Sequence, residues 1–176
     1  MAKSIYICYF GVRQPLVQTQ VVPYLLELRK DGVEIVLLTF EPDLRKKWTT
    51  DQIAEMKREM AEKGIEWHCL AYHKKLSVLA TSYDILAGAM FIRRMINAGD
   101  IDILHGRVHV PTLMGAIARR LSRHKPKLLF DIRGFFPEEY TDAGIWPENG
   151  FALPFRKTRR KMVDESRWLC RPNRKS

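Results

Sequence analysis

The chain lacks the glycine-rich loops with which α/β proteins commonly hold nucleotides. Neither G-x-G-x-x-G nor G-x-x-x-x-G-K-[ST] occurs anywhere in its 176 residues. The turn G-x-S-x-G, which exposes a nucleophilic serine, is also absent. These absences argue against a chain that holds a dinucleotide or triphosphate by itself, and they leave hydrolase chemistry without support.

Cysteine is scarce, and long apolar runs are missing. Cys8, Cys69 and Cys170 form no C-x-x-C pair, which suits a reducing cytoplasm. No apolar run approaches the ~18 residues that a bilayer-spanning helix needs. The initial MAKSIYICYFG has no long apolar region and no small-residue cleavage site, so it is not a signal peptide. We therefore expect a cytoplasmic protein.

The formal charge of +10 is concentrated at one end of the chain. Residues 151–176 carry nine Lys/Arg and two Asp/Glu, whereas the remaining residues hold 21 basic and 18 acidic side chains. A protein that coats nucleic acid is therefore not indicated. Attraction of residues 151–176 to an anionic membrane surface, such as the inner membrane face, remains open.

Short apolar segments alternate with amphipathic ones, which predicts a doubly wound, mostly parallel α/β sheet of Rossmann-like type with three layers. Apolar, β-branched segments predict strands at 4–10, 33–40, 65–70, 101–104 and 127–132. Helical spacing predicts helices over 19–30, 76–97, 111–123 and 152–169, and a further helix that opens at a capping box, Thr49–Gln52, and ends at Gly64.

Apolar periodicity also predicts which helix residues face the core. The residues expected to pack inward from the helices after the capping box are Ile53, Met56, Met60, Ala61, Met90, Phe91, Met95, Leu113, Ile117, Ala118 and Leu121. The histidines His68, His73 and His124 look like ordinary surface or edge residues.

Polar side chains gather where three of the predicted strands end. Because ligands bind at the carboxyl edge of open α/β sheets, these residues are the candidate site. The residues are Gly11 and Gln18 after the first strand, His105, Arg107 and His109 after the fourth, and Asp131, Arg133, Gly134, Glu138 and Glu139 after the fifth.

Arginines in such a rim suit a carboxylate, a phosphate or sugar hydroxyls, through planar multi-donor contacts. A histidine or carboxylate there is suited to act as general base on a hydroxyl, and His105, Glu138 and Glu139 are the candidates. The alternative is structural: Asp131 and Arg133 pair with each other or cap a neighbouring helix. A zinc site is not indicated, because His105 and His109 have no third ligand nearby in sequence.

Three segments together resemble a known family. They are the stretch from Gln18 and Gln20 through Pro23-Tyr24-Leu25, the run D-I-L-H-G-R-x-H-V-P at 102–111, and F-D-I-R-G-F-F-P-E-E at 130–139. This combination resembles the N-terminal domain of family 4 glycosyltransferases, which have the GT-B fold. The resemblance covers roughly residues 4–168 and is most specific in the last two segments.

The resemblance implies a Rossmann-like half that binds the acceptor and forms one wall of an interdomain cleft. Gly11 and its loop would approach the donor phosphates, and Arg107 and Arg133 would line the cleft. Many relatives have His-Gly where this chain has Arg133-Gly134, so a catalytic-base role is not carried over to that position. No metal is implied, and the nucleotide-sugar enters as a co-substrate rather than as a cofactor.

Family members carry a second Rossmann-like domain that binds the nucleotide-sugar, and none follows here; RPNRKS stands where a sixth strand is expected. We therefore expect an incomplete N-terminal domain at 1–168 with a polar basic tail at 169–176, inactive without a C-terminal half. The implied activity is sugar transfer to a lipid or polysaccharide acceptor of the cell envelope.

Two other functions stay open. The chain suits a stand-alone α/β module that binds a small anionic ligand at the same rim. It also suits a protein that works at a membrane surface, or on nucleic acid without specificity, through residues 151–176.

Overall fold

The computed structural model describes residues 2–73, 78–99 and 101–132. The predicted site residues Arg133, Gly134, Glu138 and Glu139 lie outside the described residues. The helix expected over 152–169 and the basic tail also lie outside them.

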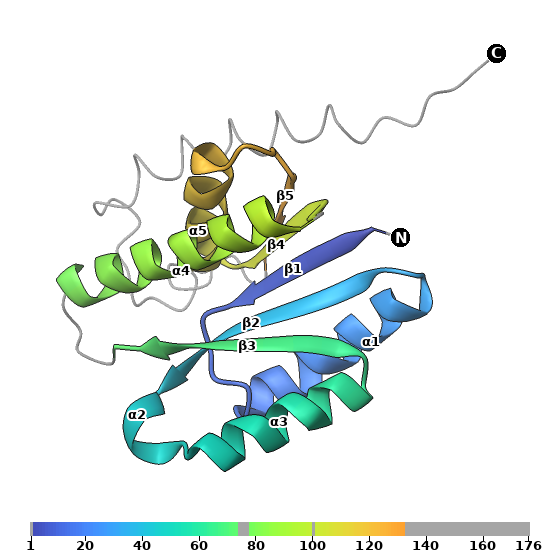
Figure 1. The fold of residues 1–176 in the computed structure, drawn as a ribbon, viewed down its shortest axis with the longest axis vertical. Coiled ribbons are helices and arrows are strands. Elements are labelled where there is room, and N and C mark those ends of the chain that lie inside the picture. Colours follow the sequence, from blue (N-terminus) through green and yellow to red (C-terminus); the bar gives the residue numbers. More distant parts are fainter. Residues whose placement is uncertain (1, 74–77, 100, 133–176) are drawn as a thin grey trace, which may run out of the picture. The chain divides into compact units, whose positions relative to one another are not determined.

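The described residues form a single sheet of five parallel strands in the order β3-β2-β1-β4-β5 (Figure 1). The strands are β1 (Lys3–Cys8), β2 (Glu34–Pro42), β3 (Ile65–Tyr72), β4 (Ile103–Arg107) and β5 (Lys127–Asp131). The predicted Rossmann-like α/β architecture is therefore confirmed.

Helices cover both faces of this sheet (Figure 1). Helices α1 (Val22–Lys30) and α3 (Thr50–Glu62) lie on one face, and α4 (Val78–Ala98) and α5 (His109–Leu121) lie on the other. A π-helical turn, η1 (Val17–Val21), leads into α1, and a short helix, α2 (Leu44–Lys47), precedes α3. The sequence analysis predicted neither η1 nor α2 as separate elements.

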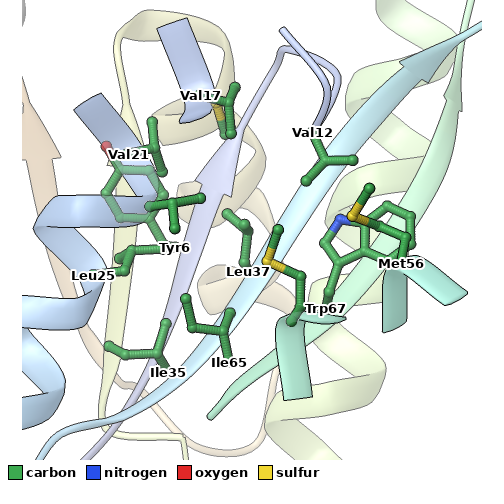
Figure 2. Packing of buried hydrophobic residues seen from close by; sticks show 13 residues of the cluster. Tyr6, Val12, Val17, Val21, Leu25, Ile35, Leu37, Met56, Ile65 and Trp67 are labelled. Carbon is green, nitrogen blue, oxygen red and sulfur yellow. The ribbon is translucent and has the colours of Figure 1, made fainter. Parts of the chain in front are cut away.

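Alternation along the central strands supplies a core on each face. From β1, Tyr6 and Cys8 pack toward α1 and α3, whereas Ile5 and Ile7 pack toward α4 and α5. Figure 2 shows the first of these cores, in which Leu37 and Trp67 of the sheet lie among helix residues such as Leu25 and Met56. Burial on both faces explains why the central strands read as nearly continuous apolar runs.

Local chemistry sets the helix ends as predicted. Thr49 and Gln52 form a reciprocal capping box at the start of α3, at 3.2 Å in each direction. Gly32 and Gly64 follow α1 and α3 with φ of 81° and 67°, the left-handed conformation that glycine adopts without steric cost.

Other sequence predictions were wrong. The fourth strand runs to Arg107, so His105 and Arg107 lie within β4 and are buried, and His109 begins α5 instead of following a strand. Apolarity alone misassigned four helix residues, because Ala61, Met90, Leu113 and Leu121 are exposed. Met56, Met60 and Ala118 are buried, as predicted.

Candidate functional site

The candidate site lies at the carboxyl edge of β1 and β4. After β1 the chain adds β2 and β3 on one side, and then returns to add β4 and β5 on the other, so the strand order reverses between β1 and β4. Ligands of open α/β sheets bind at such a switch point. A hollow of about 360 Å³ opens there, with a largely apolar lining of Tyr9, Phe10, Gln14, Phe40, Pro42, Tyr72, Val108, Val110 and Pro111.

Arg107 is the central charged group of this edge. Its side chain is only 3% exposed. Nη2 donates a hydrogen bond of 2.9 Å to Oε1 of Gln20, which belongs to η1. Nη1 is buried and has no hydrogen-bond partner of good geometry among the described residues, although the guanidinium lies close enough to the Tyr6 hydroxyl to lower the pKa of Tyr6. Because a buried guanidinium donor without a partner is costly, this atom marks a place where a ligand oxygen would be stabilised.

Three side chains form a polar group on the strands near Arg107: Tyr6 of β1, His105 of β4 itself and Asp131 of β5. The Tyr6 hydroxyl donates to Oδ2 of Asp131 at 2.9 Å, and Nε2 of His105 lies 3.9 Å from the same oxygen. The rings of Tyr6 and His105 are 4.5 Å apart between centroids. Burial raises the pKa of Tyr6 to about 12, although the nearby Arg107 guanidinium opposes this rise. Tyr6 is therefore a neutral hydrogen-bond donor at physiological pH.

The junction of β4 and α5 is held in an unusual backbone conformation. Val108 has φ 58° and ψ −170°, a region that β-branched residues rarely adopt. Its N–H donates to the carbonyl of Asp131 at 3.0 Å, and its carbonyl accepts from Oγ1 of Thr112 at 2.7 Å. Because Val108 lines the hollow, the strained residue is part of the candidate site, where such strain commonly persists.

The loop after β1 is fixed by a buried carboxylate. Glu41 is 2% exposed, and its Oε1 accepts from the Val12 N–H and from Oγ1 of Thr39, each at 2.7 Å. Burial raises the pKa of Glu41, against the opposing effect of these two donors. A Cβ at Gly11 would lie 2.7 Å from Oε2 of Glu41, so this close packing explains the glycine. Gln18 holds the loop from the other side, because its Nε2 donates to the Val12 carbonyl at 2.6 Å.

Sequence reasoning missed a second polar cluster, which adjoins the hollow. Asp84 of α4 is 1% exposed and accepts from the Tyr9 hydroxyl at 2.8 Å and from the His73 N–H at 3.0 Å. Nδ1 of His73 lies 2.5 Å from Oδ1 of Asp84. This pairing orients the half-exposed imidazole of His73, which follows β3 directly. The available signal was Asp84 itself, a lone carboxylate within a mostly apolar helix.

The structure thus brings together part of the predicted set. His105, Arg107 and Asp131 lie together on β4 and β5, and Gln20 joins them from η1. His109 lies apart from this group, with its ring 5.2 Å from that of Phe130. Gly11 and Gln18 shape the loop beside the hollow through backbone and packing contacts.

Within residues 2–73, 78–99 and 101–132, no group of three or more His, Cys, Asp and Glu side chains is placed to hold a metal ion. In the same part of the chain no helix has both the length and the apolar character needed to cross a membrane.

No family model and no curated protein matches the sequence. Among solved structures, a glycosyltransferase from Rickettsia africae ESF-5 is similar, with 16% identity and a TM-score of 0.48 over 79% of this chain and 33% of that chain. The C-terminal domain (residues 78–226) of a hydrogenase from Pyrococcus furiosus has 12% identity and a TM-score of 0.50, over 74% and 91%.

The chain therefore spans about a third of the length of that glycosyltransferase. The likeness to the hydrogenase domain, at 12% identity, shows a shared fold alone. The class that the fold defines is a Rossmann-like α/β domain with its candidate site at the β1/β4 switch point.

Proposed function

We propose that this chain is the acceptor-side half of a glycosyltransferase that moves a sugar from a nucleotide-sugar to a lipid or polysaccharide acceptor. One observation carries the proposal. The described parts of three segments far apart in sequence, which together resemble family 4 glycosyltransferases, meet around one buried guanidinium, that of Arg107. Gln20 comes from the first segment, Arg107 from the second and Asp131 from the third.

The chemistry of this group suits a hydroxylated ligand. Nη1 of Arg107 offers a donor inside a largely desolvated site, where a charge-assisted hydrogen bond to an oxygen is stronger than in water. Asp131 and His105 add acceptor and ring nitrogen atoms on the same side of the sheet. The apolar hollow at the same carboxyl edge of the sheet, which Val108 lines, is suited to the carbon skeleton of a sugar or to the first part of a lipid chain.

The donor is assigned to a second half outside this chain. The sequence has no glycine-rich phosphate loop, so we propose that the nucleotide-sugar is held mainly by a C-terminal domain. The resemblance implies acceptor-side roles for Arg133, Glu138 and Glu139 as well, and these residues lie outside the described part of the chain. The chain alone would then bind an acceptor without transferring sugar to it.

A titration of the purified, ¹⁵N-labelled chain tests the proposal. The probes are octyl glycosides below their micelle-forming concentration, UDP, and inorganic phosphate. We expect a saturable shift of backbone amide signals near Gly106 and Val108 with at least one octyl glycoside, and no saturable shift with UDP.

Two results would contradict the proposal. Saturation by UDP without any response to glycosides would indicate a nucleotide site. Saturation by phosphate alone would favour the second candidate function, a stand-alone module for small anions, which the spare donor of Arg107 also suits. The variant Arg58→Gln is the matched control. Arg58 is an exposed arginine of α3, a helix that packs on β3, whereas Arg107 lies on β4.

A further inference from the structure

The hollow at the carboxyl edge is lined by aromatic and aliphatic side chains. Among the described residues no charged side chain lines it, and Gln14 supplies its one amide. Tyr9, Phe40 and Tyr72 line it and pack with the core that α4 and α5 cover. Ligand pockets usually combine such an apolar lining with a few polar groups that fix the orientation of the ligand. A ligand in this hollow would therefore take further polar contacts from residues beside the lining.

Asp84 connects such a residue, His73, to the lining. Oδ2 of Asp84 accepts from the Tyr9 hydroxyl at 2.8 Å, and Oδ1 lies 2.5 Å from Nδ1 of His73. Because Tyr9 lines the hollow, a single carboxylate separates the imidazole from a lining residue. His73 also directly follows Tyr72, whose ring centroid lies 5.0 Å from that of Tyr9. His73 therefore lies at the side of the hollow that β3 forms.

The contacts of His73 determine which of its ring nitrogens can meet a ligand. The buried carboxylate of Asp84 holds both Nδ1 and the backbone N–H of His73, the latter at 3.0 Å. A carboxylate at Nδ1 favours the tautomer that carries its proton there, so Nε2 is an acceptor. The side chain is 48% exposed, and Nε2 forms no hydrogen bond with the described residues.

We infer that His73 is a further ligand-binding residue, whose Nε2 accepts a hydrogen bond from a hydroxyl group of the molecule in the hollow. The aromatic lining takes the apolar part of that molecule, and the imidazole fixes one hydroxyl at the β3 side. The ligand class is thus an alcohol with an apolar part, such as a glycoside. The inference rests on the proposed function, because that function assigns the hollow to the acceptor. The contact is distinct from Arg107, which bonds Gln20 of η1.

A merely structural pair would tie β3 to α4 without using Nε2. His73→Asn separates the two roles. The asparagine amide nitrogen takes about the place of Nδ1 and can still donate to Asp84, whereas no atom replaces Nε2. His68→Asn is the matched control. His68 also belongs to β3 and pairs with a carboxylate, since its Nε2 lies 2.8 Å from Oε1 of Glu66, but it precedes the carboxyl end of the strand.

The test is a correlation spectrum of the histidine rings in the full, ¹⁵N-labelled chain, titrated with octyl glycosides below their micelle-forming concentration. The spectrum of His73→Asn assigns the His73 signals. We expect the Nδ1-protonated tautomer at His73 and a saturable shift of its Nε2 signal. That shift should have the same midpoint as the shift of the Val108 amide, while the His68 ring signals stay unchanged.

Affinities of the variants give the second readout. His73→Asn should raise the Kd for the glycoside about threefold to tenfold, the usual effect of losing one hydrogen bond, with little change in urea unfolding. His68→Asn should leave the Kd unchanged. If His73→Asn destabilises the fold, the ring signals of the wild type decide.

Three outcomes would overturn the inference. Glycoside binding that shifts the Val108 amide but leaves the His73 ring signals and the His73→Asn affinity unchanged would remove His73 while leaving the proposed function intact. Absence of any glycoside binding would contradict the proposed function and this inference together. Ring shifts with inorganic phosphate and with no glycoside would identify a cationic imidazole that binds anions.

Discussion

Gly106 shows how closely single residues are constrained beside the candidate site. A Cβ at this position would lie 2.6 Å from Cα and 2.7 Å from the backbone nitrogen of Thr112. Because those atoms belong to the first turn of α5, they cannot move aside as a side chain can. Glycine at position 106 therefore allows the first turn of α5 to pack closely against the end of β4. The residue between these two elements, Val108, lines the hollow.

Gly106→Ala is therefore expected to lower the free energy of unfolding by about 2 kcal/mol, the usual cost of forcing a methyl group into a packed interior. Urea unfolding followed by circular dichroism measures the change. Gly99→Ala is the matched control, because the nearest atom to its added Cβ is the Met95 carbonyl oxygen at 3.8 Å. Equal stabilities for the two variants would show that Thr112 does not restrict position 106.

Glu41 gives stability a pH dependence. Burial raises its pKa above the ordinary value of 4.5, so the folded chain keeps the proton to higher pH than the unfolded chain does. In the window between those two values the folded state binds more protons, and its stability falls as the pH rises. Its contribution is thus largest below pH 4.5 and smallest above the raised pKa.

Glu41→Gln removes this contribution while keeping an oxygen for Val12 and Thr39. The free energy of unfolding of the wild type relative to the variant should fall as the pH rises from 4.5, at up to about 1.4 kcal/mol per pH unit within the window. Urea unfolding between about pH 4 and 7, where most proteins are stable, measures the difference. A difference that stays constant with pH would contradict this account.

At the scale of elements, the β4–α5 junction explains where the sequence analysis was wrong. The apolar pattern predicts the fourth strand at residues 101–104, with His105, Gly106 and Arg107 at its end. In the fold they continue β4, since Tyr6 of β1 covers His105 and Gln20 satisfies part of Arg107. These tertiary contacts, rather than the local polarity of the sequence, determine where β4 ends. Because Tyr6 and Gln20 are distant in sequence from β4, the local pattern could not predict the contacts.

The strain at Val108 makes a prediction for this junction. Alanine is normally more stable than glycine within folded elements, but at φ 58° and ψ −170° alanine keeps the steric conflict that glycine avoids. Both substitutions also remove the branched side chain from the hollow. We therefore expect Val108→Gly to be more stable than Val108→Ala by about 1–2 kcal/mol.

Thermal or urea unfolding of the two Val108 variants in parallel checks this order. The usual order, with alanine more stable, would mean that the junction relaxes out of its left-handed conformation. The capping box at Thr49 and the glycines at 32 and 64 needed no such partners, which is why local sequence signals were sufficient to predict them.

At the scale of the whole molecule, periodicity predicted the layers and the parallel sheet. It could not predict the His73–Asp84 pair, because β3 and α4 bring its members together and neither spacing nor composition marks the contact. Nor could it show that Met90 and Leu113 face outward. From sequence alone, an apolar residue in a helix is predicted to be buried. Which side of the helix packs against the sheet is known only from the three-dimensional structure.

At the same scale, the parts of the proposed site come from elements that are far apart in sequence. We propose that the β1/β4 switch point holds an acceptor around Arg107, beside which β1 contributes Tyr6, β5 contributes Asp131 and η1 contributes Gln20.

The most direct test of the central claim is the affinity of Arg107 variants for the best-binding octyl glycoside. Calorimetric titration should give a Kd about tenfold to a hundredfold higher for Arg107→Lys than for the wild type, because lysine keeps the charge but loses the planar guanidinium donors. Arg58→Gln should match the wild type. An unchanged Kd for Arg107→Lys, in a variant whose melting shows it to be folded, would contradict the role of Arg107 in holding the acceptor.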